Sequence, residues 1–208
     1  MLTLDETAHR LYDTATGQCL TAGTRTWCAA PASGGGLVSL REAAAWLQRL
    51  SGQPLKQPVS VIGSREASAE QLDTAEALGN ALGSIGFTVV CGGRQGIMEA
   101  VCRGVASAGG ISIGLLPETE TANANPYVTV PIATGIGEAR NVLVARAGFC
   151  LVAIGDSYGT LSEVALGLQF GRPVIGLCGA ARIEGVRQID GVGAAVDAVA
   201  RIALGLPD

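Results

Sequence analysis

Two glycine-rich segments of this sequence have the composition of loops that hold an anionic group at the start of a helix. The first is Gly92-Gly-Arg-Gln-Gly96, followed by Ile97 and Met98, and the second is Gly155-Asp-Ser-Tyr-Gly159, followed by Thr160. Glycine lets the backbone approach a ligand closely, and the first turn of a helix presents N–H groups without intrahelical partners. Both segments therefore predict a phosphate site, although tight strand-to-helix turns would also need glycines at these positions.

Arginine side chains near these segments strengthen the prediction of an anion site. A helix dipole contributes only about 0.3–1 kcal/mol to binding an anion, so useful affinity requires several N–H donors and a cation. Arg65 and Arg94 are candidates for that contact, with ordinary surface arginines as the alternative. Asp156 is a candidate for holding a ribose hydroxyl or for capping a turn. The candidate phosphate-binding residues are Gly63, Ser64, Arg65, Gly92, Gly93, Arg94, Gly96, Met98, Gly155, Asp156, Ser157, Gly159 and Thr160.

Arg140 and Glu163 are the candidate catalytic residues. We expect Arg140 in the first turn of a helix that follows Gly137, and Glu163 in the first turn of a helix that follows Gly159. A cation early in a helix opposes the macrodipole, which favours an anionic partner for Arg140, either a ligand or a carboxylate. For Glu163, the capping-box spacing of Thr160-x-x-Glu163 offers a purely structural explanation.

Apolar runs and amphipathic segments alternate through the larger part of the chain. The runs are continuous, which is typical of parallel strands that are buried on both faces. We therefore predict an α/β fold, a doubly wound Rossmann-like parallel sheet of six or seven strands with helices on both faces. Ligands bind beyond the carboxyl ends of the strands in such folds, so function is expected in loops such as those at Gly63, Gly92 and Gly155. The predicted strands lie at residues 59–63, 87–91, 111–116, 128–132, 149–154 and 174–178, and the predicted helices at 69–84, 96–107, 137–147, 160–170 and 191–204.

The beginning of the chain differs from the rest in its pattern of apolar and polar residues. Residues 1–55 predict a small N-terminal appendage with a linker, and residues 56–208 predict the Rossmann-like domain. Within the appendage, two short strands around residues 13–17 indicate a hairpin, and a glycine-rich loop follows at residues 31–36. A helix is expected over residues 39–50.

The polar side chains of this appendage predict structural roles and no functional site. Ser39 and Glu42 have capping-box spacing at the start of the predicted helix. Cys19 and Cys28 form either a disulfide across the hairpin or two free thiols, and we expect free thiols in a reducing compartment. So short a segment cannot hold a core alone, so we expect it to pack on the main domain or on a partner subunit.

The overall composition excludes disorder and indicates self-association. Apolar residues make up 48% of the chain and charged residues only 15%, against about 25% in a typical soluble domain. We therefore expect part of the surface to be covered in a homo-oligomer, a dimer or a tetramer. The longest apolar stretch is interrupted by Arg146 and is too short to span a membrane, and the acidic start does not resemble a secretory signal. These features predict a cytoplasmic protein without a membrane partner.

Charge and residue usage exclude several functional classes. The net charge of −4 argues against nucleic acid as the main partner. Lys56 is the single lysine among 14 Lys and Arg residues, and it lies in a linker, so a P-loop nucleotidase and a pyridoxal-phosphate enzyme are both excluded. The six cysteines form no C-x-x-C pair, and His9 is the one histidine, so we expect no metal site.

Several short stretches together resemble the LOG (lonely guy) superfamily, whose members long carried the label of lysine decarboxylases. Gly92-Gly-x-x-Gly-x-Met98 and Gly155-x-x-x-Gly-Thr-x-x-Glu163 are similar to the two signatures of that superfamily. Asn125-Pro-Tyr127 and Thr134-Gly-Ile-Gly-Glu-Ala-Arg-Asn141 resemble its molybdenum cofactor carrier protein branch most closely. The resemblance covers residues 58–180, but the lysine that a decarboxylase cofactor needs is missing.

The resemblance implies one of two functions. LOG enzymes cleave the N-glycosidic bond of nucleoside 5′-monophosphates without a cofactor, and their essential Arg and Glu match Arg140 and Glu163. A carboxylate stabilises oxocarbenium character at the ribose, and glycine loops hold the 5′-phosphate. The carrier branch binds and protects molybdopterin, the phosphate-bearing part of the molybdenum cofactor, usually as an oligomer.

Two departures from the enzymes favour the carrier function. Gly155-Asp-Ser stands where the enzymes have Pro-Gly-Gly, and Asn141 stands where a lysine follows their essential Arg. We therefore predict binding of a phosphorylated small molecule, either an AMP-like nucleotide or a molybdopterin-type cofactor. A LOG-type phosphoribohydrolase is the alternative.

A third interpretation is a DNA-processing protein. Gly63-Ser-Arg65 and the segment at residues 106–110 are similar to the Rossmann domain of that group. Such proteins bind single-stranded DNA, usually through a basic surface and stacking aromatic side chains. An acidic chain with 4% aromatic residues lacks both features, so this interpretation is disfavoured.

Overall fold

The computed structural model describes residues 1–30 and 35–207, which form two compact units. The first unit contains Met1–Lys56 together with the chain from Asp197 onward, and the second contains Gln57–Val196. Of the glycine-rich loop predicted at residues 31–36, residues 31–34 lie outside the described residues.

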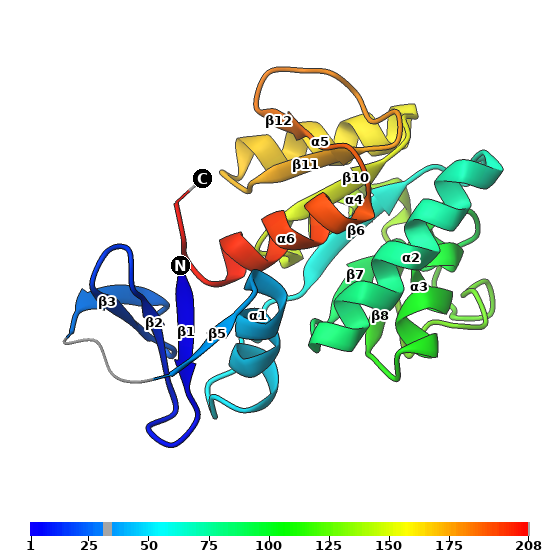
Figure 1. The fold of residues 1–208 in the computed structure, drawn as a ribbon. Coiled ribbons are helices and arrows are strands. Elements are labelled where there is room, and N and C mark those ends of the chain that lie inside the picture. The colour runs from blue at the N-terminus through cyan, green and yellow to red at the C-terminus, as the bar shows by residue number, and fades with distance from the viewer. Residues whose placement is uncertain (31–34, 208) are drawn as a thin grey trace. The chain divides into compact units, whose positions relative to one another are not determined.

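A seven-stranded sheet forms the centre of the second unit (Figure 1), and all of its strand pairs are parallel. The sheet confirms the predicted doubly wound Rossmann-like architecture. Its order is β12-β11-β10-β6-β7-β8-β9. β12 was not predicted, because it has three residues and only its first is partly buried, so it lacks an apolar run. The strands are β6 (Val59–Gly63), β7 (Val89–Cys91), β8 (Ser112–Leu116), β9 (Val130–Ala133), β10 (Leu151–Ile154), β11 (Val174–Leu177) and β12 (Val186–Gln188).

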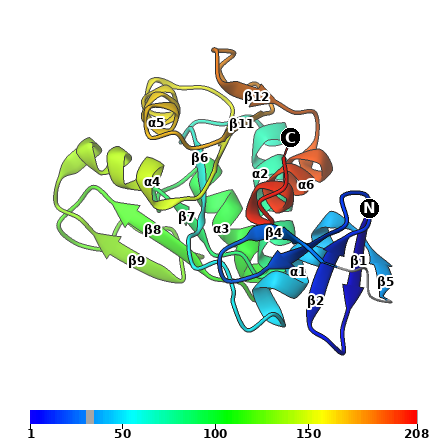
Figure 2. The same ribbon diagram turned by 90° about the vertical axis from the view of Figure 1, so that its left-hand side faces the viewer.

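Helices cover both faces of this sheet, as the sequence predicts (Figure 1 and Figure 2). α2 (Ala69–Ile85) and α3 (Ile97–Ser107) pack together on one face, and α4 (Asn141–Ala147) and α5 (Tyr158–Gln169) pack together on the other. α6 (Val192–Ala203) begins in the second unit and ends in the first.

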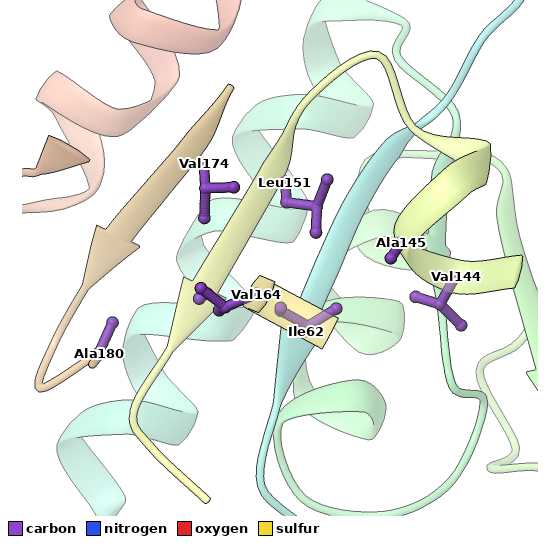
Figure 3. Close-up of a cluster of buried hydrophobic side chains, with 8 residues drawn as sticks. Ile62, Val144, Ala145, Leu151, Val164, Val174 and Ala180 are labelled. Carbon is purple, nitrogen blue, oxygen red and sulfur yellow. The ribbon is translucent and has the colours of Figure 1, made fainter. Parts of the chain in front are cut away.

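A cluster of buried aliphatic side chains joins the helix pair α4–α5 to the sheet (Figure 3). Ile62 of β6 and Leu151 of β10 belong to the same cluster as Val144 of α4 and Val164 of α5. Full burial of an aliphatic side chain contributes about 1.5–3 kcal/mol, so this cluster is enough to fix both helices on the central strands.

β6 is the point at which the strand order reverses. It pairs with β7 on one side and with β10 on the other. The chain runs outward from β6 through β7, β8 and β9, and then returns to β10 on the other side of β6. In open α/β sheets, ligands bind in the crevice at such a switch point. The loops that follow β6, β7 and β10 are therefore where a site is expected.

The prediction of an α-helix over residues 137–147 is wrong for the first four residues. Gly137–Arg140 form a 3₁₀ turn, η1, and α4 begins only at Asn141. Gly135 and Gly137 have φ angles of 67° and 60°, which an α-helix cannot include. Arg140 therefore ends the 3₁₀ turn and caps α4, rather than lying in the first turn of a helix.

The first unit contains a five-stranded antiparallel sheet in the order β4-β3-β2-β1-β5. The sequence predicted only the hairpin of β2 and β3, because strands of three or four residues give too few alternations to be recognised. α1 (Leu40–Arg49) begins with the predicted capping box of Ser39 and Glu42. The strands are β1 (Leu2–Asp5), β2 (Arg10–Asp13), β3 (Gln18–Thr21), β4 (Thr26–Ala29) and β5 (Gly36–Val38).

The core of the first unit is small and includes the end of the chain. Leu11 and Leu20 of the sheet, Trp46 and Leu47 of α1, and Leu204 belong to one buried cluster. The indole N–H of Trp27 donates to the backbone carbonyl of Leu204 at 2.8 Å. The two cysteines of the hairpin β3–β4 lie directly opposite each other and are free thiols.

Candidate functional site

A pocket of about 560 Å³ lies at the switch point of the seven-stranded sheet. Its walls come from the end of β6 and the loop after it, from the start of the β7–α3 loop, from η1 and from the first two turns of α5. The lining residues are Ile62, Gly63, Ser64, Arg65, Glu66, Gly92, Met98, Glu138, Arg140, Asn141, Ser157, Tyr158, Gly159, Thr160, Ser162 and Glu163. A volume of this size is typical of a small-molecule site.

The predicted pair of Arg140 and Glu163 meets in the wall of this pocket. One terminal guanidinium nitrogen of Arg140, Nη1, donates to Oε1 of Glu163 at 3.4 Å. Both residues are buried, with 4% and 6% of their surfaces exposed. A buried charge is stable only when it is paired and hydrogen-bonded. Arg140 is incompletely satisfied, because its buried Nε finds no acceptor among the described residues.

Gly92 makes room for the guanidinium of Arg140. A Cβ atom at this position would lie 2.6 Å from Nη2 of Arg140 and 2.7 Å from Sδ of Met98. Any side chain here would displace both neighbours, so the glycine is needed for the position of Arg140. In the structure the guanidinium of Arg140 lies against this glycine, and the phosphate contact predicted from the sequence stays a prediction.

The start of α3 is partly occupied by the protein itself. The N–H of Ile97 donates to the backbone carbonyl of Ser64 at 3.0 Å. Gly96 has a φ of 72°, and a Cβ there would collide with the backbone of Ser64 and Arg65. The β7–α3 loop therefore packs against the loop after β6, which reduces the number of N–H groups it offers to an anion.

The start of α5 is more accessible than that of α3. Ser157 caps this helix, and its Oγ accepts a hydrogen bond from the N–H of Thr160 at 3.2 Å. The N–H groups at the beginning of a helix have no intrahelical acceptor. Those of Tyr158 and Gly159, which both line the pocket, therefore remain for a ligand.

The capping-box explanation of Glu163 is wrong. Ser157 is the N-cap of α5, so Thr160 lies inside the first turn and Glu163 in the second. The sequence could not separate these alternatives, because Ser157 and Thr160 are both good capping residues. Local structure does not account for the burial of Glu163, whereas its pairing with Arg140 does.

Burial changes the acidity of Glu163. Desolvation raises the pKa of this carboxyl to about 7, although the charge of Arg140 acts in the opposite direction. Glu138 adds to the upward shift through charge repulsion. A carboxyl group that titrates near neutral pH is suited to accept or to donate a proton.

Charged and aromatic side chains form the rim of the pocket. Arg65 and Glu138 make an ion pair at 3.3 Å, with half or more of each side chain exposed. Such exposed pairs contribute about 0–1 kcal/mol, so Arg65 can exchange its partner for a stronger anion. Tyr158 is 95% exposed. Nδ2 of Asn141 donates to Oγ of Ser162 at 3.2 Å and links α4 to α5.

The structure brings most of the predicted site residues to the pocket, but not all. Gly93 and Gly96 lie in the β7–α3 loop without lining the pocket, and Arg94 forms an ion pair with Glu118 instead. Gly155 and Asp156 also lie outside the lining. The predicted residues that do line it are Gly63, Ser64, Arg65, Gly92, Met98, Arg140, Ser157, Gly159, Thr160 and Glu163.

Sequence reasoning missed several lining residues. Ile62, Glu66 and Ser162 directly neighbour predicted residues in the chain, so a wider window would have included them. Glu138 and Asn141 flank Arg140, but only the 3₁₀ turn brings both to the pocket. Within residues 1–30 and 35–207, no group of three or more His, Cys, Asp or Glu side chains could hold a metal ion. No helix in this part of the chain is long and apolar enough to cross a membrane.

Comparison with known proteins identifies related sequences. A model of the SLOG cluster4 family matches residues 56–199. An uncharacterised protein of Archaeoglobus fulgidus is 35% identical over 129 residues, which cover 62% of this chain and 85% of that protein.

Solved structures resemble about 70% of this chain. The molybdenum cofactor binding protein of Rippkaea orientalis superposes with a TM-score of 0.67 and 30% identity, over 71% of this chain and 98% of that one. The Moco carrier protein of Chlamydomonas reinhardtii gives a TM-score of 0.66 and 32% identity, over 73% of this chain and 100% of that one. DNA processing protein A of Streptococcus pneumoniae, at 17% identity and a TM-score of 0.55 over 69% of this chain and 61% of that one, shares the fold alone.

The raised pKa of Glu163 predicts a pH dependence of stability. The carboxyl group of Glu163 has a pKa of about 7 in the folded protein and an ordinary value of 4.5, which applies to the unfolded chain. Between these pH values the folded state therefore binds more protons than the unfolded state does. The free energy of unfolding should therefore fall as the pH rises from 4.5 to 7, by roughly 3 kcal/mol from this group. The Glu163→Gln variant should lack this component in urea denaturation series at several pH values.

Glu138→Gln is the matched control for this measurement, because Glu138 is an exposed carboxylate of the same pocket. Because Glu138 makes the smallest contribution to the raised pKa of Glu163, this variant should retain most of the parent's slope of stability against pH. If Glu163→Gln has the same slope of stability against pH as the parent, Glu163 is not the titrating group.

Proposed function

The chain belongs to the SLOG cluster4 family, and from this membership we propose that its pocket binds a phosphorylated small molecule, a nucleotide or a molybdopterin-type cofactor. The membership also confirms the resemblance to the LOG superfamily that the sequence predicts. One observation carries the proposal. Arg140, whose buried Nε has no acceptor among the described residues, lines the same pocket at the switch point of the sheet as Tyr158 and Gly159 at the start of α5.

The phosphate is assigned to the start of α5. The N–H groups of Tyr158 and Gly159 provide two donors, and the partial positive charge of the helix start adds to them. Arg65 supplies the cation once the phosphate replaces Glu138 as its partner. A phosphate dianion carries more charge than a carboxylate, so this exchange favours ligands that are phosphorylated.

The remainder of the ligand is assigned to the inner part of the pocket. Ile62 and Met98 supply apolar surface, and Arg140 supplies the Nε donor for an acceptor atom of the ligand. The fully exposed ring of Tyr158 offers a face on which a heteroaromatic ring can stack. A pterin and a purine both have such a ring together with acceptor atoms on its edge.

The relatives support the carrier form of this proposal. Two solved proteins that share about 30% of their residues with this chain bind or carry the molybdenum cofactor. The cofactor is in that case the cargo, and the residues of this chain would hold its phosphate and its pterin. Asn141, in place of a lysine, also leaves the pocket with fewer cations than the LOG enzymes have.

A specific observation favours phosphoribohydrolase activity as the second candidate. Glu163 is buried beside Arg140, and its pKa is raised to about 7. In its ionised form this carboxylate would stabilise positive charge that develops on a ribose during cleavage of the N-glycosidic bond. Arg140 would hold both the carboxylate and the substrate in place.

We also propose that the protein is a homo-oligomer in a reducing, cytoplasmic setting. The free state of all described cysteines agrees with such a setting. β9, the residue before η1, and α4 expose large apolar side chains that a second copy of the chain would cover. These are Val130, Ile132, Ile136, Val142 and Leu143, each between 41% and 49% exposed.

Ligand binding is tested by thermal unfolding in the presence of AMP or molybdopterin. At a ligand concentration of about 100 times the dissociation constant, we expect a stabilisation of about 2.7 kcal/mol. Arg140→Gln should abolish the stabilisation because it removes both the free donor and the partner of Glu163. Arg172→Gln, outside the pocket, is the control and should bind as the parent does. If neither AMP nor molybdopterin stabilises the protein, the result contradicts the proposal.

Hydrolase activity is tested by chromatography of AMP after incubation with the protein. The enzyme alternative predicts that free adenine appears with the parent and that Glu163→Gln stops its release without unfolding the protein. If the protein is a carrier, its ligand should stabilise it against thermal unfolding, and no free base should appear. Adenine release that persists in Glu163→Gln would remove this residue from the mechanism.

Light scattering after gel filtration tests the oligomer. The parent should elute with at least twice the chain mass of 21.0 kDa. The double variant Ile132→Glu/Leu143→Glu should shift toward the monomer, because it places charges in the proposed interface. Ile111→Glu, at a similarly exposed apolar residue before β8, should not. A monomeric parent would contradict the proposal.

A further inference from the structure

The motif Asn125-Pro-Tyr127 has no part in the pocket described above. It lies in the connection between β8 and β9, and none of its residues lines the pocket. Yet Asn125 is 3% exposed, although asparagine is usually found at the surface. A buried amide must satisfy its hydrogen bonds, so its partners indicate what it holds in place.

Asn125 directs its hydrogen bonds at the β7–α3 loop. Its Nδ2 donates to the carbonyl of Gly93 at 3.2 Å and to that of Arg94 at 3.0 Å. Its backbone N–H also donates to the carbonyl of Gly93, at 2.9 Å. Its Oδ1 accepts from the N–H of Tyr127 at 3.1 Å. Asn125 thus ties two successive carbonyl groups of the loop to the β8–β9 connection.

The loop needs such restraints because its glycines do not fix its conformation. Gly93 and Gly96 both have φ angles of 72°, in the left-handed region that glycine adopts without a steric penalty. On the side of Gly96, the hydrogen bond from Ile97 to Ser64 holds the loop. At Gly93 and Arg94, the three hydrogen bonds to Asn125 hold it. The backbone position of Gly92, at the start of the loop, follows from these restraints.

The position of Gly92 in turn sets that of Arg140. The guanidinium lies so close to Gly92 that a Cβ atom would be 2.6 Å from Nη2. Among the described residues, Arg140 has a single ion-pair partner, Glu163, at a long distance of 3.4 Å. Contact with the loop is therefore a large part of what holds the guanidinium in place.

We infer that Asn125 is a positioning residue of the pocket, which fixes the β7–α3 loop and through Gly92 the guanidinium of Arg140. It acts on the ligand only through Arg140. The consequence for ligand binding rests on the proposed function, whereas the effect on Arg140 does not.

The test compares Asn125→Ala and the milder Asn125→Ser with Ser112→Ala. Ser112 is also buried, and its Oγ holds the same β8–β9 connection through the N–H of Thr129 at 3.1 Å and the carbonyl of Tyr127 at 3.4 Å. None of the hydrogen bonds that Ser112 makes with described residues reaches the β7–α3 loop. Loss of a buried hydrogen bond should lower the melting temperature in all three variants, so stability alone does not distinguish the roles.

The distinguishing readout is the NMR signal of the Arg140 Nε–H group in the ligand-free protein, assigned with Arg140→Lys. We expect it to move, and its exchange with solvent to quicken at least tenfold, in Asn125→Ala. Asn125→Ser should change it in the same direction, and Ser112→Ala should leave it as in the parent. If Asn125→Ala fails to fold, Asn125→Ser alone decides. An unchanged signal in the folded Asn125 variants, or an equal change in Ser112→Ala, would overturn the inference.

Ligand affinity separates this inference from the proposed function. With AMP as the probe, the dissociation constant should rise at least tenfold in Asn125→Ala and stay within twofold of the parent in Ser112→Ala. If AMP and molybdopterin both fail to bind the parent, the proposed function fails while the signal of Arg140 still tests Asn125. If the parent binds and Asn125→Ala binds equally well, the positioning role fails alone.

Discussion

The buried ion pair of Arg140 and Glu163 is the interaction on which the site depends. Neither charge could remain away from water alone, because desolvation of an unpaired ion costs several kcal/mol. The pair brings together η1, which precedes α4, and the second turn of α5, so it joins the two helices that flank the switch point. The Nε of Arg140, a residue that lines the pocket, is left without an acceptor among the described residues. A ligand with an acceptor atom would complete the hydrogen bonding that the protein leaves open.

The same pair accounts for both candidate functions. A carrier needs Arg140 as a donor and Glu163 as the group that orients it, whereas a hydrolase needs the charge of Glu163 at the reacting centre. With a pKa of about 7, Glu163 is only partly ionised at neutral pH. The ionised fraction can stabilise positive charge on a ribose, and the protonated fraction can donate a hydrogen bond to a bound ligand. The electrostatics of the pocket are therefore compatible with both candidate functions.

The sequence predicted the sheet and the loops that carry function, because continuous apolar runs such as residues 151–154 are characteristic of buried parallel strands. It could not say what each glycine approaches. Gly92 indicates a close contact, but only the fold shows that the guanidinium of Arg140 lies against it. Glu163 was ambiguous because two residues could cap α5, and tertiary pairing decided between them. The role of Asn125 depends on a contact across 32 residues of chain, which no local pattern reveals.

The most direct test of this account is a crystal structure of the protein with the molecule that stays bound through purification, or with AMP soaked into the crystals. The account predicts an acceptor atom of the ligand within hydrogen-bond distance of Nε of Arg140, and a phosphate against the N–H groups of Tyr158 and Gly159. A ligand bound elsewhere, or Nε of Arg140 directed at a protein acceptor while the pocket is filled, would contradict it.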